Sequence, residues 1–437
     1  MRWLVGSLLL LLIATVFQLG LLVYSMYALL VVMLGSRWLT IYWAENLTVL
    51  REINRETVEQ GEQVAVVVTV RNRGQLPVPW FLLEDLLQKS AIMYRPASLQ
   101  VSGRRLFLAM MRGNSTKRFS YQIKCNRRGY YQIGPTVIET GDLFGLHRKF
   151  KVGAAPDYLM VLPEVVPLDG FDIASRRPIG EIRMTHRLFE DPTRIAGVRQ
   201  YQPGDPMNRV NWAATARTGV LHSKVFEPSS IAGVTILLDF HQDSFDPKHE
   251  PIRSELAITL SAAIANSLQL MGQQIGLVTN ARDAAERIKS EGWDFDARSR
   301  KAAQKAATVQ TDNARKRPQI VETKRGAEQF SQILEVLARA EKNDGLTLPE
   351  LITETASRMP RDATVIVILT KVTDEMALSL GNLRRIGFAV TAMINIYDEY
   401  DYAKAAGKLL SEGIMSRQLH DPDNIHAICG PQAYSLF

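Results

Sequence analysis

The chain begins with a long run of apolar residues. From Trp3 to Leu34 the run is interrupted only by Gly, Ser, Thr and Tyr and by the single Gln18. As one helix, at ~1.5 Å per residue, this run would reach ~48 Å, well beyond the ~30 Å hydrocarbon core of a bilayer. We therefore expect a transmembrane helical hairpin within residues 1–44, with spans near 2–17 and 19–38.

Basic residues predict the orientation of this anchor. Arg2 precedes the first span, Arg37, Arg51 and Arg55 follow the second, and the turn between the spans is uncharged. The positive-inside rule puts both ends in the cytoplasm. We expect a two-span anchor in the inner (cytoplasmic) membrane, with the bulk of the chain in the cytoplasm. A signal anchor or a cleaved signal peptide would export the bulk instead, but the apolar run is too long for a signal peptide.

Short strand-like runs follow the apolar segment. Val64 to Val70 predicts a strand, and 106–110 and 119–124 predict a hairpin that turns at 112–114. Glycines at turn spacing then separate further short strands: Gly129, Gly134, Gly141 and Gly145. Residues 45–165 are expected to form an immunoglobulin-like β-sandwich.

The pattern changes at residue 235. Helical periodicity over 255–271 and 328–340 alternates with four β-branched, apolar runs, at 235–238, 274–279, 365–370 and 388–394. This alternation is typical of a doubly wound α/β sheet. The chain is therefore expected to be multidomain, with a connecting segment at 166–234 and a Rossmann-like α/β domain at 235–437. A basic, polar insertion at 280–324 lacks apolar periodicity, and we expect it to be mobile or loosely helical.

Charge and cysteine content argue against a nucleic-acid-binding protein and a disulfide-bonded protein. The net charge is +7, and residues 298–325 alone hold nine Lys or Arg against two acidic residues, so the basic character belongs to one segment. No nucleic-acid partner is expected from it, although such a segment near an anionic leaflet could contact membrane lipid. Cys125 and Cys429 are the only cysteines, which excludes a disulfide framework and suits a reducing compartment.

Ligands bind open α/β sheets beyond the carboxyl ends of the strands, which makes the run from Asp239 a candidate site. It resembles the first loop of a von Willebrand factor A domain, where Asp-x-Ser-x-Ser binds magnesium, but His241 and Asp243 stand at the serine positions. Lys371 stands where such domains place a further Asp, and Asp374 lies three residues on. The four residues Asp239, His241, Asp243 and Asp374 thus resemble a degenerate metal site. We expect no cofactor, with Mg²⁺ as the alternative and a transition metal at His241 as another.

The most specific stretch of the chain is 190–227. Its signature residues are Arg199, Tyr201, Gly204, Asp205, Arg209, Trp212 and Arg217. Its arginines can grip carboxylates such as Asp205 or Glu227. These residues either clamp the segment onto the sheet or form a partner-facing or anion-binding surface. A hydrolase or transferase site at Arg199, Asp205 and Arg217 is a further alternative, but the chain contains no phosphate-binding loop, zinc-binding His pair or Gly-x-Ser-x-Gly elbow. We expect no enzymatic activity.

The same stretch resembles the signature of the bacterial family called domain of unknown function 58. The resemblance also covers Arg127-Arg128-Gly129-Tyr130, Gly134-Pro135, 141–146 and Val161-Leu162-Pro163. It implies a membrane hairpin, a β-rich domain and a von Willebrand A-like domain. Members of the family commonly sit beside MoxR-type AAA+ ATPases and transglutaminase-like membrane proteins. The resemblance therefore implies a non-catalytic interaction or scaffold protein for the assembly or maturation of membrane or cell-envelope complexes. The alternative is a divalent-metal-dependent protein-binding module.

Overall fold

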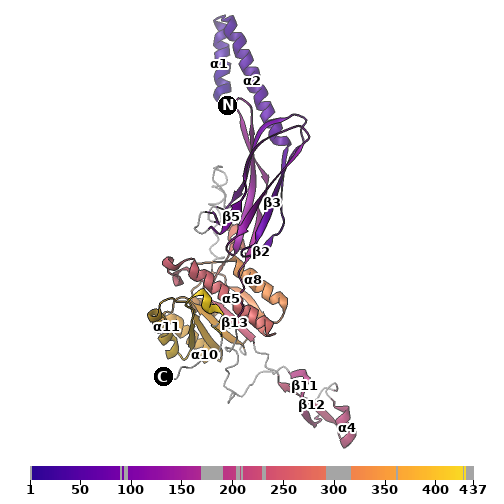
Figure 1. Ribbon diagram of the computed structural model, residues 1–437, viewed down its shortest axis with the longest axis vertical. Helices are drawn as coiled ribbons and strands as arrows, with labels where there is room; N and C mark the ends of the chain where they lie inside the picture. The colour runs from indigo at the N-terminus through magenta and orange to yellow at the C-terminus, as the bar shows by residue number, and fades with distance from the viewer. Residues whose placement is uncertain are drawn as a thin grey trace. The chain divides into compact units, whose positions relative to one another are not determined.

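The computed structural model describes most of the chain (Figure 1). The described residues are 2–88, 91–92, 97–168, 190–202, 207, 210–228, 233–291, 316–360, 363–426 and 428–429. They divide into two units: Met1–Glu164 with Arg282–Ala314 and Glu335–Glu341, and Val165–Ala281 with Arg315–Leu334 and Lys342–Phe437. The chain is thus multidomain, with an N-terminal apolar helix, several β-sheets and an α/β region.

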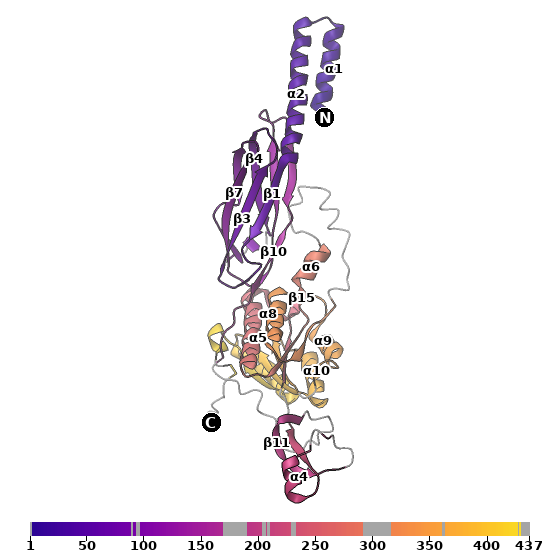
Figure 2. The same cartoon turned by 90° about the vertical axis from the view of Figure 1, so that its right-hand side faces the viewer.

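The apolar run forms two antiparallel helices, α1 (Arg2–Val16) and α2 (Gly20–Asn46), which lie side by side (Figures 1 and 2). The predicted turn is confirmed, and within it Gln18 has a φ of 51°. Among the described helices, α2 alone is long and apolar enough to cross a membrane, and α1 is a shorter apolar helix. The second helix continues beyond the expected end near residue 38 because one face of its last turns is buried, at Met33, Ser36, Thr40, Trp43 and Ala44.

Two sheets of the first unit share one core. The four-stranded sheet has the order β1 (Leu47–Ile53), β3 (Gln63–Asn72), β7 (Thr116–Cys125) and β5 (Leu99–Ser102). The other sheet has the order β2 (Thr57–Glu59), β10 (Asp157–Leu162), β8 (Gly129–Gly141), β4 (Val78–Leu87) and β6 (Leu106–Met111), and β9 (Arg148–Ala154) pairs with β8. Alternate residues of β3, such as Val66 and Val68, and residues of β4, such as Phe81 and Leu83, meet in this core.

The predicted hairpin at 106–110 and 119–124 is wrong in its pairing. Both segments are strands, but β6 pairs with β4, whereas β7 pairs with β3 and β5. The chain crosses between the sheets at Asn114, which has a φ of 51°. Asn72 Nδ2 fixes this crossing by donating to the carbonyl oxygens of Leu76 and Arg112, each at 3.0 Å. Alternation shows that a strand has one buried face, but it does not identify the neighbouring strand.

A buried ion pair connects the two sheets. Arg51 Nη1 of β1 lies 2.9 Å from Asp85 Oδ1 of β4, and both side chains are at most 2% exposed. Asp85 also accepts hydrogen bonds from Thr136 Oγ1 at 2.9 Å and from Tyr121 Oη at 2.6 Å. Burial and the Asp85 carboxylate raise the pKa of Tyr121, so its hydroxyl stays protonated and donates. The Asp85 carboxylate is therefore held by donors from three other strands.

Gly134 leaves the space that the Arg51 guanidinium occupies. Its φ is +90°, and an added Cβ would lie 1.9 Å from Arg51 Nη1. We expect Gly134→Ala to lower the free energy of unfolding by about 4 kcal/mol or more, because backbone strain adds to the loss of a buried ion pair. The control is Gly61→Ala, since Gly61 has a φ of +93° and no atom within 4 Å of an added Cβ. Chemical denaturation of the detergent-solubilised chain measures both variants, and equal losses would contradict the role of Gly134.

The second unit contains a six-stranded sheet with the order β16-β14-β13-β18-β19-β20. β13 (Gly233–Leu238), β14 (Gln274–Thr279), β18 (Thr364–Leu369), β19 (Ala389–Ile394) and β20 (Met415–Gln418) run parallel, and β16 (Gln319–Lys324) is antiparallel to β14. The helices are α5 (Ile252–Leu270), α8 (Ala327–Arg339), α9 (Leu348–Thr355), α10 (Asp374–Arg385) and α11 (Glu399–Ser411). α9, α10 and α11 pack on the face that includes Leu237, Val365 and Val367, and α5 covers the other face (Figure 2). The four predicted strands and two predicted helices are confirmed, and the central strands are buried on both faces.

The prediction that 280–324 is a mobile or loosely helical insertion is wrong at both ends. Residues after Asn280 form β15 (Arg282–Asp283) and α6 (Ala284–Glu291), and β16 is an edge strand of the main sheet. An edge strand pairs on one side only, and β16 has one buried residue, Val321, so it needs no apolar run that a pattern could reveal. Residues 292–315 lie outside the described residues.

Candidate functional site

Asp239 lies at the carboxyl edge of the six-stranded sheet, directly after β13, and it is buried. Its Oδ1 accepts hydrogen bonds from the His241 N–H at 3.2 Å and from Asn280 Nδ2 at 2.9 Å, and its Oδ2 accepts from Ser244 Oγ at 2.6 Å. Asn280 follows β14, and its Oδ1 accepts from the Phe240 N–H at 2.6 Å. These bonds join the loops after two neighbouring strands and occupy both oxygens of the carboxylate.

His241 and Asp243 lie beside Asp239 on the same loop. The Asp243 N–H donates to His241 Nδ1 at 3.3 Å, so this ring nitrogen acts as an acceptor. The Asp243 carboxylate is exposed, with Oδ2 3.9 Å from the same ring nitrogen. Backbone bonds pair His241 with Asn343, which fixes the loop against the chain that follows α8. The His241 ring is thus largely buried, and Asp243 forms the exposed rim of the site.

Asp374 stands on a different element, at the start of α10. Its exposed carboxylate lies 2.9 Å from Lys408 Nζ of α11. Within the part of the chain that is described, no group of three or more His, Cys, Asp or Glu is placed to hold a metal ion. The metal site composed of Asp239, His241, Asp243 and Asp374 stays a prediction, and its first three residues share one loop.

A pair of isosteric variants tests the role of Asp239. Asp239→Asn is expected to lower the free energy of unfolding by ~1–3 kcal/mol, because its amide nitrogen would face groups that already donate. Asp243→Asn, at the exposed rim, is expected to change it by no more than ~0.5 kcal/mol. Because protein donors occupy both Asp239 oxygens, we also expect the wild-type Tm to be equal in millimolar Mg²⁺ and in EDTA. A Tm increase in Mg²⁺ that Asp239→Asn abolishes would instead show an ion at this loop.

The signature segment folds on itself. β11 (Glu190–Gln200) and β12 (His222–Pro228) form a two-stranded antiparallel sheet, and α4 (Trp212–Thr218) lies between them in sequence. Asn211 caps α4 by accepting a hydrogen bond from the Ala214 N–H at 3.2 Å, and Gly219 ends the helix at a φ of 71°. Val210 forms a bridge with Ser223, and both residues are buried. The signature segment therefore has buried residues of its own.

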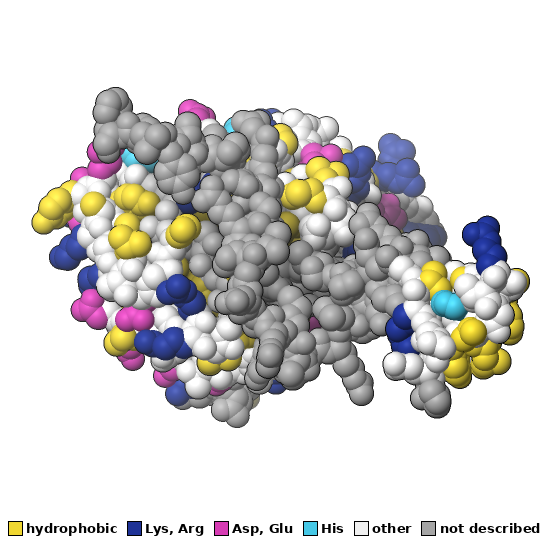
Figure 3. Space-filling view, turned by 90° about the horizontal axis from the view of Figure 1, so that it is seen from below, with side chains coloured by type: hydrophobic (Ala, Val, Ile, Leu, Met, Phe, Trp, Pro, Cys, Tyr) yellow, Lys and Arg dark blue, Asp and Glu magenta, His cyan; other side chains and the backbone are white. Residues whose placement is uncertain are grey.

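The outside of the segment includes several exposed apolar residues among polar ones. Its exposed large apolar residues, which we call the signature surface, are Val198, Met207, Trp212, Val220 and Leu221. Figure 3 shows yellow side chains gathered around a single histidine on this segment, at the right of the view. α4 has no buried residue. Trp212 is 64% exposed, which is unusual for a side chain of that size.

The structure describes four of the seven predicted signature residues: Arg199, Tyr201, Trp212 and Arg217. Arg199 Nη1 donates to the Gln200 carbonyl oxygen at 3.2 Å, the Tyr201 N–H donates to the Leu221 carbonyl oxygen at 2.8 Å, and Arg217 lies in the last turn of α4. Gly204, Asp205 and Arg209 lie outside the described residues, so the predicted pairs with Asp205 stay predictions. The described strands of the segment pair only with each other, and both interpretations of the segment, as a clamp on the sheet and as a partner-facing surface, stay predictions.

The sequence assigned no role to Arg128, and the structure gives it one. Arg128 is buried directly before β8, and its Nη1 donates to the carbonyl oxygens of Leu337 at 2.8 Å and Ala340 at 2.9 Å. These carbonyls lie at the C-terminal end of α8, where a cation is favourable. The Arg-Arg-Gly-Tyr fragment was the sequence signal that could have pointed to Arg128. The sequence could not identify the residues that Arg128 binds, because they lie more than 200 residues away.

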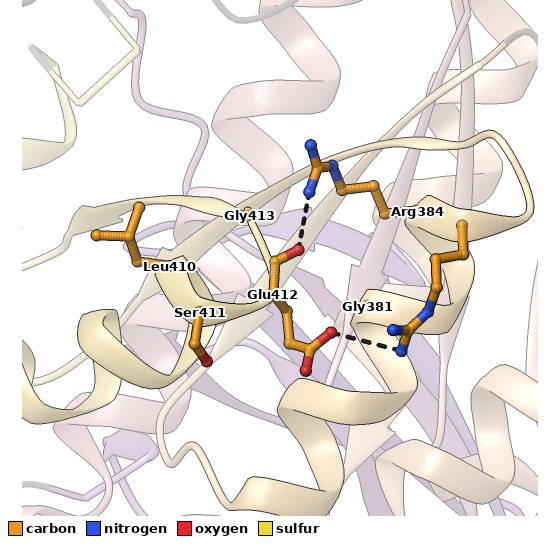
Figure 4. Close-up of a pocket in the computed structure, with 7 residues that line it drawn as sticks. Gly381, Arg384, Leu410, Ser411, Glu412 and Gly413 are labelled. Carbon is orange, nitrogen blue, oxygen red and sulfur yellow. Dashed lines mark hydrogen bonds and ion pairs between the residues drawn. The ribbon is translucent and has the colours of Figure 1, made fainter.

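One cavity lies at the opposite edge of the six-stranded sheet, between the C-terminal ends of α10 and α11 (Figure 4). It encloses about 460 Å³ and is lined by Gly381, Arg384, Arg385, Leu410, Ser411, Glu412 and Gly413. Arg384 Nη1 donates to the Glu412 carbonyl oxygen at 2.9 Å, and Arg385 Nη2 lies 3.4 Å from the Glu412 carboxylate. Because Glu412 already binds both arginines, this cavity is a weaker candidate for an anion site than its charge suggests.

A family model and a curated protein match parts of this chain. Residues 197–293 match the family model described as "Protein of unknown function DUF58". The relative is "Uncharacterized protein YeaD" of Bacillus subtilis (strain 168), which is 25% identical over 265 residues, or 60% of this chain and 62% of the relative. The match therefore spans less than two thirds of the relative's own length.

Solved structures are similar only in parts. The CARDB domain of the PF1109 protein from Pyrococcus furiosus matches 26% of this chain and 91% of its own, with 14% identity and a TM-score of 0.19. Proximal thread matrix protein 1 from the mussel byssus matches 45% of this chain and 46% of its own, with 8% identity and a TM-score of 0.28. TM-scores at this level carry no argument about fold or function.

Proposed function

We propose that this DUF58-family protein, whose family resemblance is confirmed by the match over residues 197–293, is a non-catalytic, membrane-anchored interaction protein. Its proposed partner is a MoxR-type AAA+ ATPase, and a transglutaminase-like membrane protein is the proposed third component. Together they would serve the assembly or maturation of membrane or cell-envelope complexes. The observation that carries this function is the signature surface, which lies within the most specific stretch of the sequence and faces outward.

Exposing apolar side chains to water costs free energy, and binding a partner that covers them would recover it. Single exposed apolar residues are common on soluble proteins, but a cluster on one small unit marks an interaction site. Trp212 provides a large, rigid contact of the kind that dominates binding energies. The polar residues around it, such as Arg217 and His222, suit the rim of an interface.

The fold in this proposal has two named parts. The six-stranded sheet is a von Willebrand A-like domain, and its strand order with the antiparallel edge strand β16 supports this assignment. The facing sheets of the first unit are an immunoglobulin-like sandwich, which their shared core supports. Both carboxylate oxygens of Asp239 accept hydrogen bonds from protein donors. This arrangement supports an interaction role without a metal ion at the loop.

The anchor in this proposal is a two-span hairpin in the inner membrane, with the bulk of the chain in the cytoplasm. The length and the exposed apolar surface of α2 support one span. α1 has 15 residues and would reach only ~22 Å, so it would need local thinning of the bilayer or tilting of its neighbour. The basic residues Arg37 and Arg55, after the second span, support the orientation.

Variants of the signature surface test this function. The full chain in mild detergent is titrated with the purified MoxR-type ATPase encoded by the same genome. Trp212→Ser with Leu221→Ser is expected to weaken binding by roughly 30-fold or more, because loss of a central aromatic anchor costs ~2 kcal/mol or more.

The matched control is Leu410→Ser, which removes an apolar side chain that is 68% exposed, against 64% for Trp212, from α11 of the same unit. It is expected to bind like wild type. Unmeasurable binding by wild type, or equal weakening in both variants, would overturn the proposed partner or the proposed surface, respectively. Circular dichroism checks that each variant keeps its fold.

A further inference from the structure

The turn between β8 and β9 exposes three large apolar side chains. Leu143, Phe144 and Leu146 are exposed, within a turn of six residues, 142–147. Turns on a water-facing surface favour polar residues, Gly and Pro, because these satisfy or tolerate the turn backbone. The core that the two sheets of the first unit share does not include these three side chains. Their exposure therefore calls for a partner outside the described chain.

Asp142 fastens this turn to the apolar helix α2. The buried Asp142 carboxylate accepts hydrogen bonds from Ser36 Oγ of α2 and from the His147 N–H, the latter at 3.0 Å. Burial raises the pKa of Asp142, but these hydrogen bonds outweigh it and leave the pKa below its usual value, so the group stays ionised near neutral pH. Trp80 Nε1 adds a bond of 3.2 Å to the Asp142 carbonyl oxygen. The turn is thus held in one position by both its side chain and its backbone.

The point of attachment lies well inside the helix. Ser36 precedes the end of α2 at Asn46 by ten residues, which is ~15 Å along the axis. On the N-terminal side of Ser36 most exposed residues of α2 are apolar, for example Val31 and Leu34, although Ser25 is also exposed. On its C-terminal side, exposed Trp38 stacks on Tyr42 with ring centroids 5.7 Å apart. Aromatic residues at the end of an apolar helix mark the membrane interface, so the turn lies at the level of that interface.

The charges around the turn fit a lipid surface. Arg37 follows Ser36 on α2, and Arg148 and Lys149 follow the turn. Arg148 lies 3.8 Å from Glu139 and Lys149 lies 3.3 Å from Glu45, in solvent-accessible ion pairs of the kind that contribute little. Basic residues next to inserted apolar side chains bind the anionic headgroups of the cytoplasmic leaflet. Continuity with α2 and this basic rim favour lipid over a protein as the occupant.

We propose that Leu143, Phe144 and Leu146 form a membrane-inserting turn, which enters the interfacial layer of the cytoplasmic leaflet beside α2. This inference rests on the proposed anchor. The turn gives the first unit a second attachment beside α2, and the two attachments fix the orientation of the β-sheets on the membrane. The occupant is a bilayer with anionic phospholipid, recognised by apolar burial and by the basic rim.

Fluorescent probes at single cysteines test the insertion in the full chain. Leu143→Cys, Val31→Cys in α2 and Leu108→Cys in β6 start from side chains that are 75%, 70% and 71% exposed. Burial raises the pKa of the native Cys125 to about 11 and that of Cys429 to about 12, so both stay unlabelled near neutral pH, and the unsubstituted chain measures any background. Each variant is labelled with a nitrobenzoxadiazole dye and reconstituted into vesicles of phosphatidylcholine and phosphatidylglycerol.

We expect lipids brominated near the headgroup to quench the probe at 143 by roughly twofold or more over the probe at 108, because the turn lies in the interface. Deeply brominated lipids should quench the probe at 31, and aqueous iodide the probe at 108. A probe at 143 that responds only to iodide overturns the inserted turn. A probe at 143 shielded from both quenchers also overturns it, because protein would then cover the turn. Failure of the proposed anchor is distinguishable, since it would leave the probe at 31 open to iodide.

Discussion

The buried ion pair between Arg51 and Asp85 is the constraint on which the first unit depends. Two charges can be taken out of water only if their remaining hydrogen-bonding groups are satisfied, and here this requires donors and acceptors from both sheets. Asp85 is bound by Arg51, Thr136 and Tyr121, while Arg51 Nε also donates to Asp157 Oδ2 of β10 at 2.9 Å. β1 follows α2 directly, so the same network connects the apolar helix to both sheets.

Strand β8 brings the family-like fragments of the first unit into one physical scheme. Its 13 residues span ~43 Å at the rise of a strand. At its start Arg128 binds the carbonyls that end α8, in its middle Gly134 makes room for the Arg51 guanidinium, and after its end Asp142 binds Ser36. These fragments follow one another in the sequence and thus act at the start, in the middle and after the end of one strand. In the second unit, the signature segment has buried residues of its own, Val210 and Ser223, and exposed apolar residues such as Trp212, and this combination is the basis on which we propose it as a docking element.

The sequence predicts elements better than it predicts their partners. The four central strands of the α/β sheet were found because strands buried on both faces are continuous apolar runs. The pairing of β6 and β7 was missed because alternation carries no information about which strand lies alongside. The Asp239 loop was placed at the carboxyl edge, but its partner Asn280 depends on strand order. Trp212 illustrates a further limit. A large aromatic residue is usually mostly buried, and only the fold shows that this one is exposed.

The most direct test of the central claim, that the signature surface docks a cytosolic ATPase, is site-specific photo-crosslinking in the native cells. A photoreactive phenylalanine analogue replaces Trp212 in one strain and Leu410, of similar exposure, in another. Mass spectrometry then identifies the adducts after membrane solubilisation. The account predicts an adduct with a MoxR-type AAA+ ATPase from position 212 and none from position 410. Adducts from position 212 that fall only within this protein, or the same adducts from both positions, would contradict it.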